Sequence, residues 1–267
     1  MRINVPRTTV IAAVFLLSAQ SWAGEWPPQE LHNLQVLPED TTVRELVETM
    51  REFAGALGVR CTHCHVGEDS NDLTSIEFAS DAKIEKRKAR AMIRMVKHIN
   101  GELLPEVPER SDPPVEVTCR TCHHSVTRPV DIRDLLTDAF RADGPDSAIA
   151  LYRELREDYY GSDSYDFRPF MLTNVAERVA RKNPQGAIQL LEFNGSLHPD
   201  SGQTFATMAQ VYRLQGDIDN AVRSMERAVA AEPGAEWYHQ ALDRLRKQQQ
   251  ANENDEPTTA GIEEKKP

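Results

Sequence analysis

Four cysteines and two histidines form two copies of one pattern, Cys-x-x-Cys-His, at residues 61–65 and 119–123. Two thiols at this spacing lie one helical turn apart and can add to both vinyl groups of one haem, and the histidine that follows can bind the iron. The sequence therefore predicts two covalently bound haem c groups. Their thioether residues would be Cys61, Cys64, Cys119 and Cys122, and their proximal iron ligands would be His65 and His123.

Other interpretations of the cysteines leave more of the pattern unexplained. Two disulfides would not account for a histidine after each pair, and a zinc site made of four cysteines would leave both histidines without a role. A thioredoxin-like redox motif requires a strand before the cysteines, whereas the residues before Cys61 have a helical pattern. Thioether attachment uses all four cysteines and both histidines.

The residue at the sixth position of each iron separates an electron carrier from an enzyme with an open site. Met50 precedes Cys61 on a helical pattern, and a break at Gly58 would let the attachment segment fold back beside it. The alternative role of Met50 is that of a core methionine, and the residues alone leave this choice open. For the second haem the alternatives are Met92, Met95 and His98, and His32 is a minor candidate for the first.

Helices must position these ligands. The first is expected to begin at Thr42, where Thr42 and Glu45 have the capping-box pattern, and to end at Gly58. A second is expected from near Ser80-Asp81 to Asn100-Gly101, followed by a proline-containing linker over residues 104–117. The expected apolar face of the first helix consists of Val43, Leu46, Val47, Met50, Phe53, Ala54 and Leu57, and that of the second of Ile84, Ala91, Met92, Met95, Val96 and Ile99.

A repeat occupies the second half of the chain, where the pattern is almost purely helical from Asp131 onward. Ala187-Ile188 and Leu191 match Ala221-Val222 and Met225 at a spacing of 34 residues, which is the tetratricopeptide period. An earlier unit around Ala148 is out of phase, at 39 residues from Ala187. The alternative is an ordinary bundle of helical hairpins. Either way the fold class is all-α, with a small dihaem cytochrome c domain followed by a helical-hairpin, tetratricopeptide-like repeat domain.

The ends of the chain and its charge suggest an exported acidic protein. Residues 1–23 have the positive start, short apolar run and small residues of a signal peptide cleaved after Ala23, and their apolar run of roughly 10 residues is shorter than the ~20 that span a bilayer. An uncleaved anchor is the alternative. The formal charge of -11 becomes -13 once residues 1–23, with two arginines and no acid, are removed. The expected domains are 1–23, 24–130, 131–247 and a disordered polar tail at 248–267.

Residues from about 33 to 130 resemble the cytochrome c subunit of photosynthetic reaction centres. The resemblance rests on the capped helix with Met50, both cysteine motifs with their flanking residues, the segment 78–81 and the segment 90–100. It implies that a methionine on the helix before each motif is the sixth ligand, which assigns Met50 to the first haem and Met92 to the second, with Met95 or His98 as alternatives. This chain departs from the resemblance in having two motifs instead of four and in lacking a lipid-anchoring cysteine.

We therefore expect a periplasmic dihaem cytochrome that carries single electrons between redox proteins, with docking aided by the repeats. The acidic charge favours a partner with a basic docking face and argues against nucleic acid. The mean hydropathy of -0.54 argues against membrane spans in the mature chain, although a membrane-associated redox complex is an allowed partner. The alternatives are a peroxidase-like enzyme with one open haem, an electron donor to a photosynthetic reaction centre, and a redox-sensing or scaffolding protein.

Overall fold

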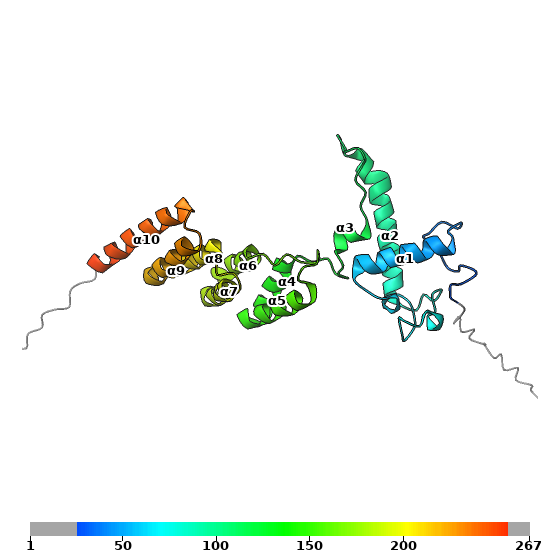
Figure 1. Cartoon of the computed structure of the whole chain (residues 1–267), viewed down its shortest axis with the longest axis horizontal. Helices are drawn as coiled ribbons and strands as arrows, with labels where there is room; N and C mark the ends of the chain where they lie inside the picture. Colours follow the sequence, from blue (N-terminus) through cyan, green and yellow to red (C-terminus); the bar gives the residue numbers. More distant parts are fainter. Residues whose placement is uncertain (1–25, 256–267) are drawn as a thin grey trace, which may run out of the picture. The chain divides into compact units, whose positions relative to one another are not determined.

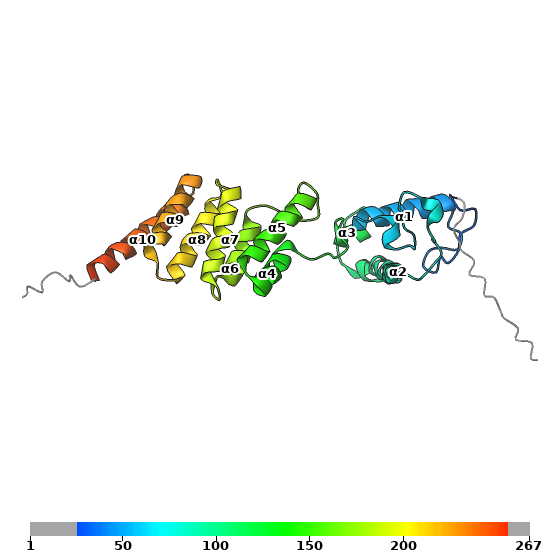
Figure 2. The ribbon, with the colours of Figure 1, turned by 90° about the horizontal axis from the view of Figure 1, so that it is seen from below.

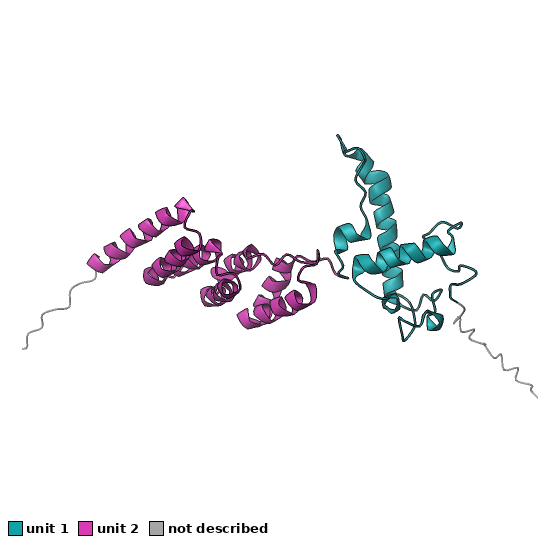
Figure 3. Ribbon diagram, viewed as in Figure 1, with its two compact units in different colours: residues 1–127 teal, residues 128–267 magenta. Residues whose placement is uncertain are grey.

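The computed structural model describes residues 26–255, so the expected signal peptide at residues 1–23 lies outside the described residues. Within residues 26–255 the secondary structure is helical, without a β-strand and with one isolated bridge between Val66 and Glu77. This confirms the all-α prediction. The chain divides into two compact units between Thr127 and Arg128 (Figure 3), close to the boundary at residues 130 and 131 that the sequence predicts.

Helix α1 (Val43–Leu57) begins and ends where the sequence predicts (Figure 1). The Thr42 hydroxyl accepts a hydrogen bond from the Glu45 backbone N–H at 3.3 Å, and the Glu45 carboxylate accepts one from the Thr42 N–H at 2.8 Å. Gly58 ends the helix with a φ of 66°, in the left-handed region that favours glycine. A side chain at Gly58 would also overlap the carbonyl oxygen of Ser125, so two independent constraints require glycine here.

Helix α2 (Ile84–His98) starts later than predicted, and a turn of π-helix, η3 (Ile99–Leu103), continues it. The expected start near Ser80-Asp81 is wrong because the Asp81 carboxylate pairs with Arg90 and Lys86 instead of capping a helix. The expected apolar face of α2 is also only partly covered, since Ile84, Met92 and Met95 remain 44–47% exposed and Arg90 is the buried residue of this helix.

Short helical turns carry the two cysteine motifs. The first motif begins in the 3₁₀ turn η1 (Cys61–His63), and the second forms the single-turn helix α3 (Cys119–His123). Between α2 and α3 the chain is largely irregular, as the prolines predict, and Asn100 closes this segment by bonding both the N–H and the carbonyl of Val117 at 2.8 Å. The remaining short turns are η2 (Leu73–Ser75) and η4 (Leu104–Glu106).

The second unit consists of the helices α4 (Ile132–Asp143), α5 (Pro145–Tyr159), α6 (Phe170–Ala180), α7 (Pro184–Leu197), α8 (Gly202–Leu214), α9 (Ile218–Ala231) and α10 (Glu236–Asp255). They form three antiparallel pairs, α4 with α5, α6 with α7 and α8 with α9, followed by α10, which packs on α9 (Figure 2). The residues matched by the 34-residue spacing lie on α7 and α9, and all are buried there. The connection at residues 160–169 is longer than the one at 198–201, which explains why the unit around Ala148 is out of phase.

Helix α10 corrects the expected start of the disordered tail at residue 248, because it continues to Asp255. Gln249 lies on this extension and donates a hydrogen bond to the Asp219 carboxylate on α9 at 2.7 Å, so the helix has a tertiary contact beyond the predicted boundary. In the described part of the chain, no helix combines the length and the apolar character needed to cross a membrane.

Candidate haem site

A cavity of about 630 Å³ in the first unit is lined by residues of α1, α2 and both cysteine motifs. This volume lies in the range of about 300–1,000 Å³ that is usual for small-molecule and cofactor sites. The apolar face of α1 therefore faces a cofactor-sized space, and not a closed side-chain core. All seven predicted members of that face line the cavity: Val43, Leu46, Val47, Met50, Phe53, Ala54 and Leu57.

The four cysteine thiols are free, and three of them, Cys61, Cys64 and Cys119, line this cavity. Burial raises the pKa of the Cys64 thiol, and the negative charge of nearby Glu85 raises it further. Burial also raises the pKa of the Cys119 thiol. Thiols of redox-active Cys-x-x-Cys motifs have lowered pKa values, because the thiolate is the reactive form. The electrostatics of these two cysteines are therefore opposite to those of a dithiol redox centre.

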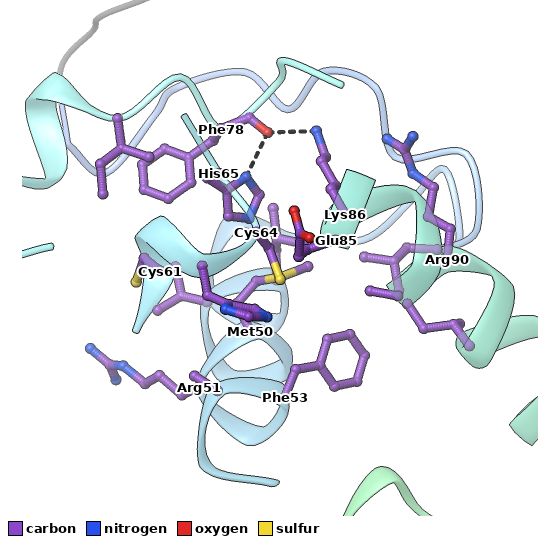
Figure 4. A pocket seen from close by; sticks show the side chains of 18 of the residues that line it. Met50, Arg51, Phe53, Cys61, Cys64, His65, Phe78, Glu85, Lys86 and Arg90 are labelled. Carbon is purple, nitrogen blue, oxygen red and sulfur yellow. Dashed lines mark hydrogen bonds between the residues drawn. The ribbon is translucent and has the colours of Figure 1, made fainter. Parts of the chain in front are cut away.

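His65 is held in the orientation that an iron ligand needs. Its Nδ1 lies 3.1 Å from the main-chain carbonyl oxygen of Phe78, and its ring meets the Phe78 ring edge-on at 5.1 Å (Figure 4). Burial, reinforced by the Lys86 charge, lowers the pKa of His65 to about 4, so the imidazole is neutral at pH 7. With the Nδ1 proton donated to the carbonyl, the Nε2 lone pair is left for a metal.

His123 repeats this arrangement in the second motif. Its Nδ1 lies 2.9 Å from the carbonyl oxygen of Val126, a buried residue. The turn that carries this acceptor is tied to α1, since the Ser125 N–H donates to the Ala56 carbonyl at 3.0 Å and the Ser125 hydroxyl donates to that of Gly55 at 3.2 Å. The end of α1 therefore helps to orient the second histidine.

The methionines proposed as sixth ligands lie on the two helices that line the cavity. Met50, on α1, lines it together with Cys64 and His65 (Figure 4), and Met92, on α2, lines it as well. Met95 and His98, the alternatives to Met92, are not among the lining residues, and His98 lies 3.1 Å from the Glu102 carboxylate. His32, the minor candidate for the first haem, lines the cavity.

A polar cluster beside His65 was not predicted. Lys86 and Arg90, one turn apart on α2, both pair with Asp81, at 3.1 and 2.8 Å. Arg90 also donates to the Asn33 carbonyl at 2.9 Å. The only sequence signal for this cluster is the four-residue spacing of the two cations, which predicts one shared face but not the segment that faces it.

The donor set fits haem c. Each motif places two thiols one turn apart beside a histidine whose Nδ1 is bonded to a carbonyl, and the cavity supplies apolar walls and two methionine side chains. In residues 26–255, no group of three or more His, Cys, Asp or Glu side chains is arranged to hold a metal ion. Haem attachment would require no such group, because a haem iron takes only one or two ligands from the protein.

Comparison with known proteins agrees with this chemistry. Residues 32–141 match the family of the photosynthetic reaction centre cytochrome c subunit. The chain is also 32% identical over 108 residues to cytochrome c-554 of Chloroflexus aurantiacus, an alignment that covers 40% of this chain and 23% of the relative. The chain thus spans less than a quarter of the length of that relative. The haem-site segment of this chain is similar to reaction-centre cytochromes, a similarity that implies covalently bound haem c and electron transfer.

Proposed function

We propose that this chain is an exported dihaem c-type cytochrome that carries single electrons between redox partners. The observation that supports this most is the matching geometry of His65 and His123, each with Nδ1 on a main-chain carbonyl, at 3.1 and 2.9 Å. Such contacts fix the ring orientation and leave Nε2 for iron. Bound haem would supply reversible one-electron chemistry.

The chain's own residues would hold, orient and shield the two groups. Cys61, Cys64, Cys119 and Cys122 would form the thioethers, and His65 and His123 would be the proximal ligands. Met50 and Met92, which the resemblance assigns and which both line the cavity, would be the sixth ligands. A thioether opposite histidine favours reduced iron and would suit an electron carrier. The apolar side chains of α1 that line the cavity would exclude water from the first ring.

Counting haems by mass tests this proposal. The protein made with haem-attachment machinery in the periplasm is expected to carry two haems per chain under denaturing conditions, since thioethers survive unfolding. Replacing Cys61 and Cys64 by alanine, or Cys119 and Cys122 by alanine, is expected to remove one haem in each case. A wild-type chain with one haem or none would contradict the dihaem proposal, and the same spectrum tests cleavage after Ala23.

A second candidate function depends on the sixth ligand of the second haem. Met92, Met95 and His98 lie on the same helix as alternatives for this position, and a haem whose sixth position stays open would suit a peroxidase-like enzyme. Carbon monoxide separates the two functions. A carrier with both sixth positions filled should bind none when reduced, whereas stoichiometric binding to one haem would support the enzyme. A Met92→Ala variant, which opens that position deliberately, is the positive control.

We further propose that the second unit, with its tetratricopeptide-like spacing, docks the redox partner. The net charge of -13 of the mature chain supports a partner with a basic face. The surface is not uniformly acidic, because α2 exposes Arg87, Lys88, Arg94 and Lys97 and carries a single acid, Glu85. Electron transfer to the native partner should slow as salt is raised, and removal of residues 131–267 should slow it at low salt. An unchanged rate after removal would refute docking through this unit.

A further inference from the structure

The carbonyl oxygen of Phe78 accepts two hydrogen bonds at once. One comes from His65 Nδ1 at 3.1 Å, and the other from the Lys86 ammonium at 2.8 Å (Figure 4). A carbonyl oxygen has two lone pairs, so both donors can be accommodated. The contact that orients the first proximal histidine is therefore shared with a positive charge.

Lys86 is fixed in this position. Its three N–H donors are matched by three acceptors, namely the carbonyls of Phe78 and Ser80, at 2.8 and 2.9 Å, and the Asp81 carboxylate at 3.1 Å. Its side chain is 12% exposed. Arg90, 9% exposed, holds the other side of Asp81 at 2.8 Å, so the acceptor of Lys86 is itself restrained.

A shared acceptor alters what the histidine donates to iron. A strong acceptor on Nδ1–H makes an imidazole more basic, and this favours oxidised iron. A cation on the same oxygen withdraws electron density from it and weakens it as an acceptor. The same cation also opposes the extra positive charge that the iron gains on oxidation, in a site where burial reduces screening. Both effects favour reduced iron.

We propose that Lys86 is a positioning residue for the first haem. Lys86 shares the Phe78 carbonyl with His65 and thereby raises the reduction potential of that haem. This inference rests on the proposed dihaem function, and it gives a physical reason for the two haems to differ in reduction potential. The second site provides an internal reference, because His123 bonds the Val126 carbonyl, and no lysine in residues 26–255 donates to that oxygen.

A spectroelectrochemical titration of the dihaem protein and its Lys86→Met variant tests the inference. We expect one of two one-electron transitions to move to lower potential, by about tenfold in the equilibrium constant for reduction, or ~59 mV, while the other stays in place. Lys86→Arg, which keeps a cationic donor, should retain most of the wild-type reduction potential. Lys88→Met is the matched control, since Lys88 is an exposed lysine of α2 that also lines the cavity.

Three outcomes would overturn the inference. They are an unchanged potential in Lys86→Met, an equal shift in Lys88→Met, and a shift of both haems together. If Lys86→Met fails to take up haem, Lys86→Gln decides, because it keeps a hydrogen-bond donor without the charge, and an unchanged potential in that variant would refute the role of the cation. A wild-type chain that carries a single haem would refute the dihaem function instead, so the two failures are distinguishable.

Discussion

Within the described part of the first unit, the buried apolar residues are Ala56, Ile76 and Val126, whereas the second unit buries apolar side chains on every helix from α4 to α10. The apolar residues of α1 line a cavity, and those of α7 and α9 pack against neighbouring helices. The second unit thus has a core made of its own side chains. The first unit has a core that a cofactor completes.

The size of the cavity shows how much this difference matters. Unfilled apolar volume in an enclosed core is destabilising, by about 24 cal/mol per Å³, and the apolar space here is about 630 Å³. The whole stability of a small domain is only about 5–15 kcal/mol, so a unit with such an unfilled space has little stability in reserve. The first unit is therefore expected to depend on haem for its fold, as many small metal-binding domains depend on their metal.

The largest expected effect is the loss of the first unit's fold in protein without haem. A variant with all four cysteines replaced by serine should show rapid amide hydrogen exchange over residues 26–127, while α4–α9 remain protected. The haem-loaded wild type is the control and should protect both units. Equal protection of both units in the haem-free variant would refute the claim that the fold of the first unit, but not that of the second, depends on haem.

The next effect concerns Gly58, which connects α1 to the second motif. Gly58→Ala is expected to destabilise the haem-loaded protein by about 2–6 kcal/mol, because a left-handed alanine costs ~1–3 and displacing the Ser125 carbonyl costs ~1–3. Denaturant unfolding followed by haem absorbance measures this. Gly55→Ala is the matched control, since a side chain there meets nothing within 4 Å and should stabilise the helix by ~0.5–1 kcal/mol. Similar values for both variants would contradict the role of the Ser125 contact.

The smallest effect is the pH dependence of the Asp81 cluster. The Arg90 guanidinium, the Asn33 amide and Lys86 hold the pKa of the Asp81 carboxyl well below its usual range. A lowered pKa contributes stability that is present above the unfolded value, about 3.9, and is lost as the pH falls through the folded value. Asp81→Asn should therefore be less stable than wild type by a constant amount from pH 8 to 5, below about 1 kcal/mol because the pair is partly exposed.

In strongly acidic solution the difference between Asp81→Asn and wild type should disappear. Thermal unfolding across this pH range measures it, with Glu68→Gln as a control that removes an exposed carboxylate of the same unit. A difference that already disappears near neutral pH would show that Asp81 is not held ionised by its partners.

Local features of the sequence determined a large part of this protein. The two Cys-x-x-Cys-His motifs, the capping box at Thr42 and the stop at Gly58 depend on residues a few positions apart, and so does the apolar face of α1. The 34-residue spacing likewise predicted equivalent buried positions on α7 and α9. These signals can be read because helix geometry and thioether chemistry impose short, regular spacings.

Only the tertiary structure decided which groups surround the motifs. The contact of Gly58 with Ser125 and that of Arg90 with Asn33 join residues more than fifty positions apart, and no periodicity encodes such pairs. The same holds for the Phe78 carbonyl, which receives both His65 and Lys86 because the loop after the first motif folds back onto α2. Asp81 illustrates the physical reason, since a side chain suited to cap a helix forms ion pairs instead once two cations lie within reach.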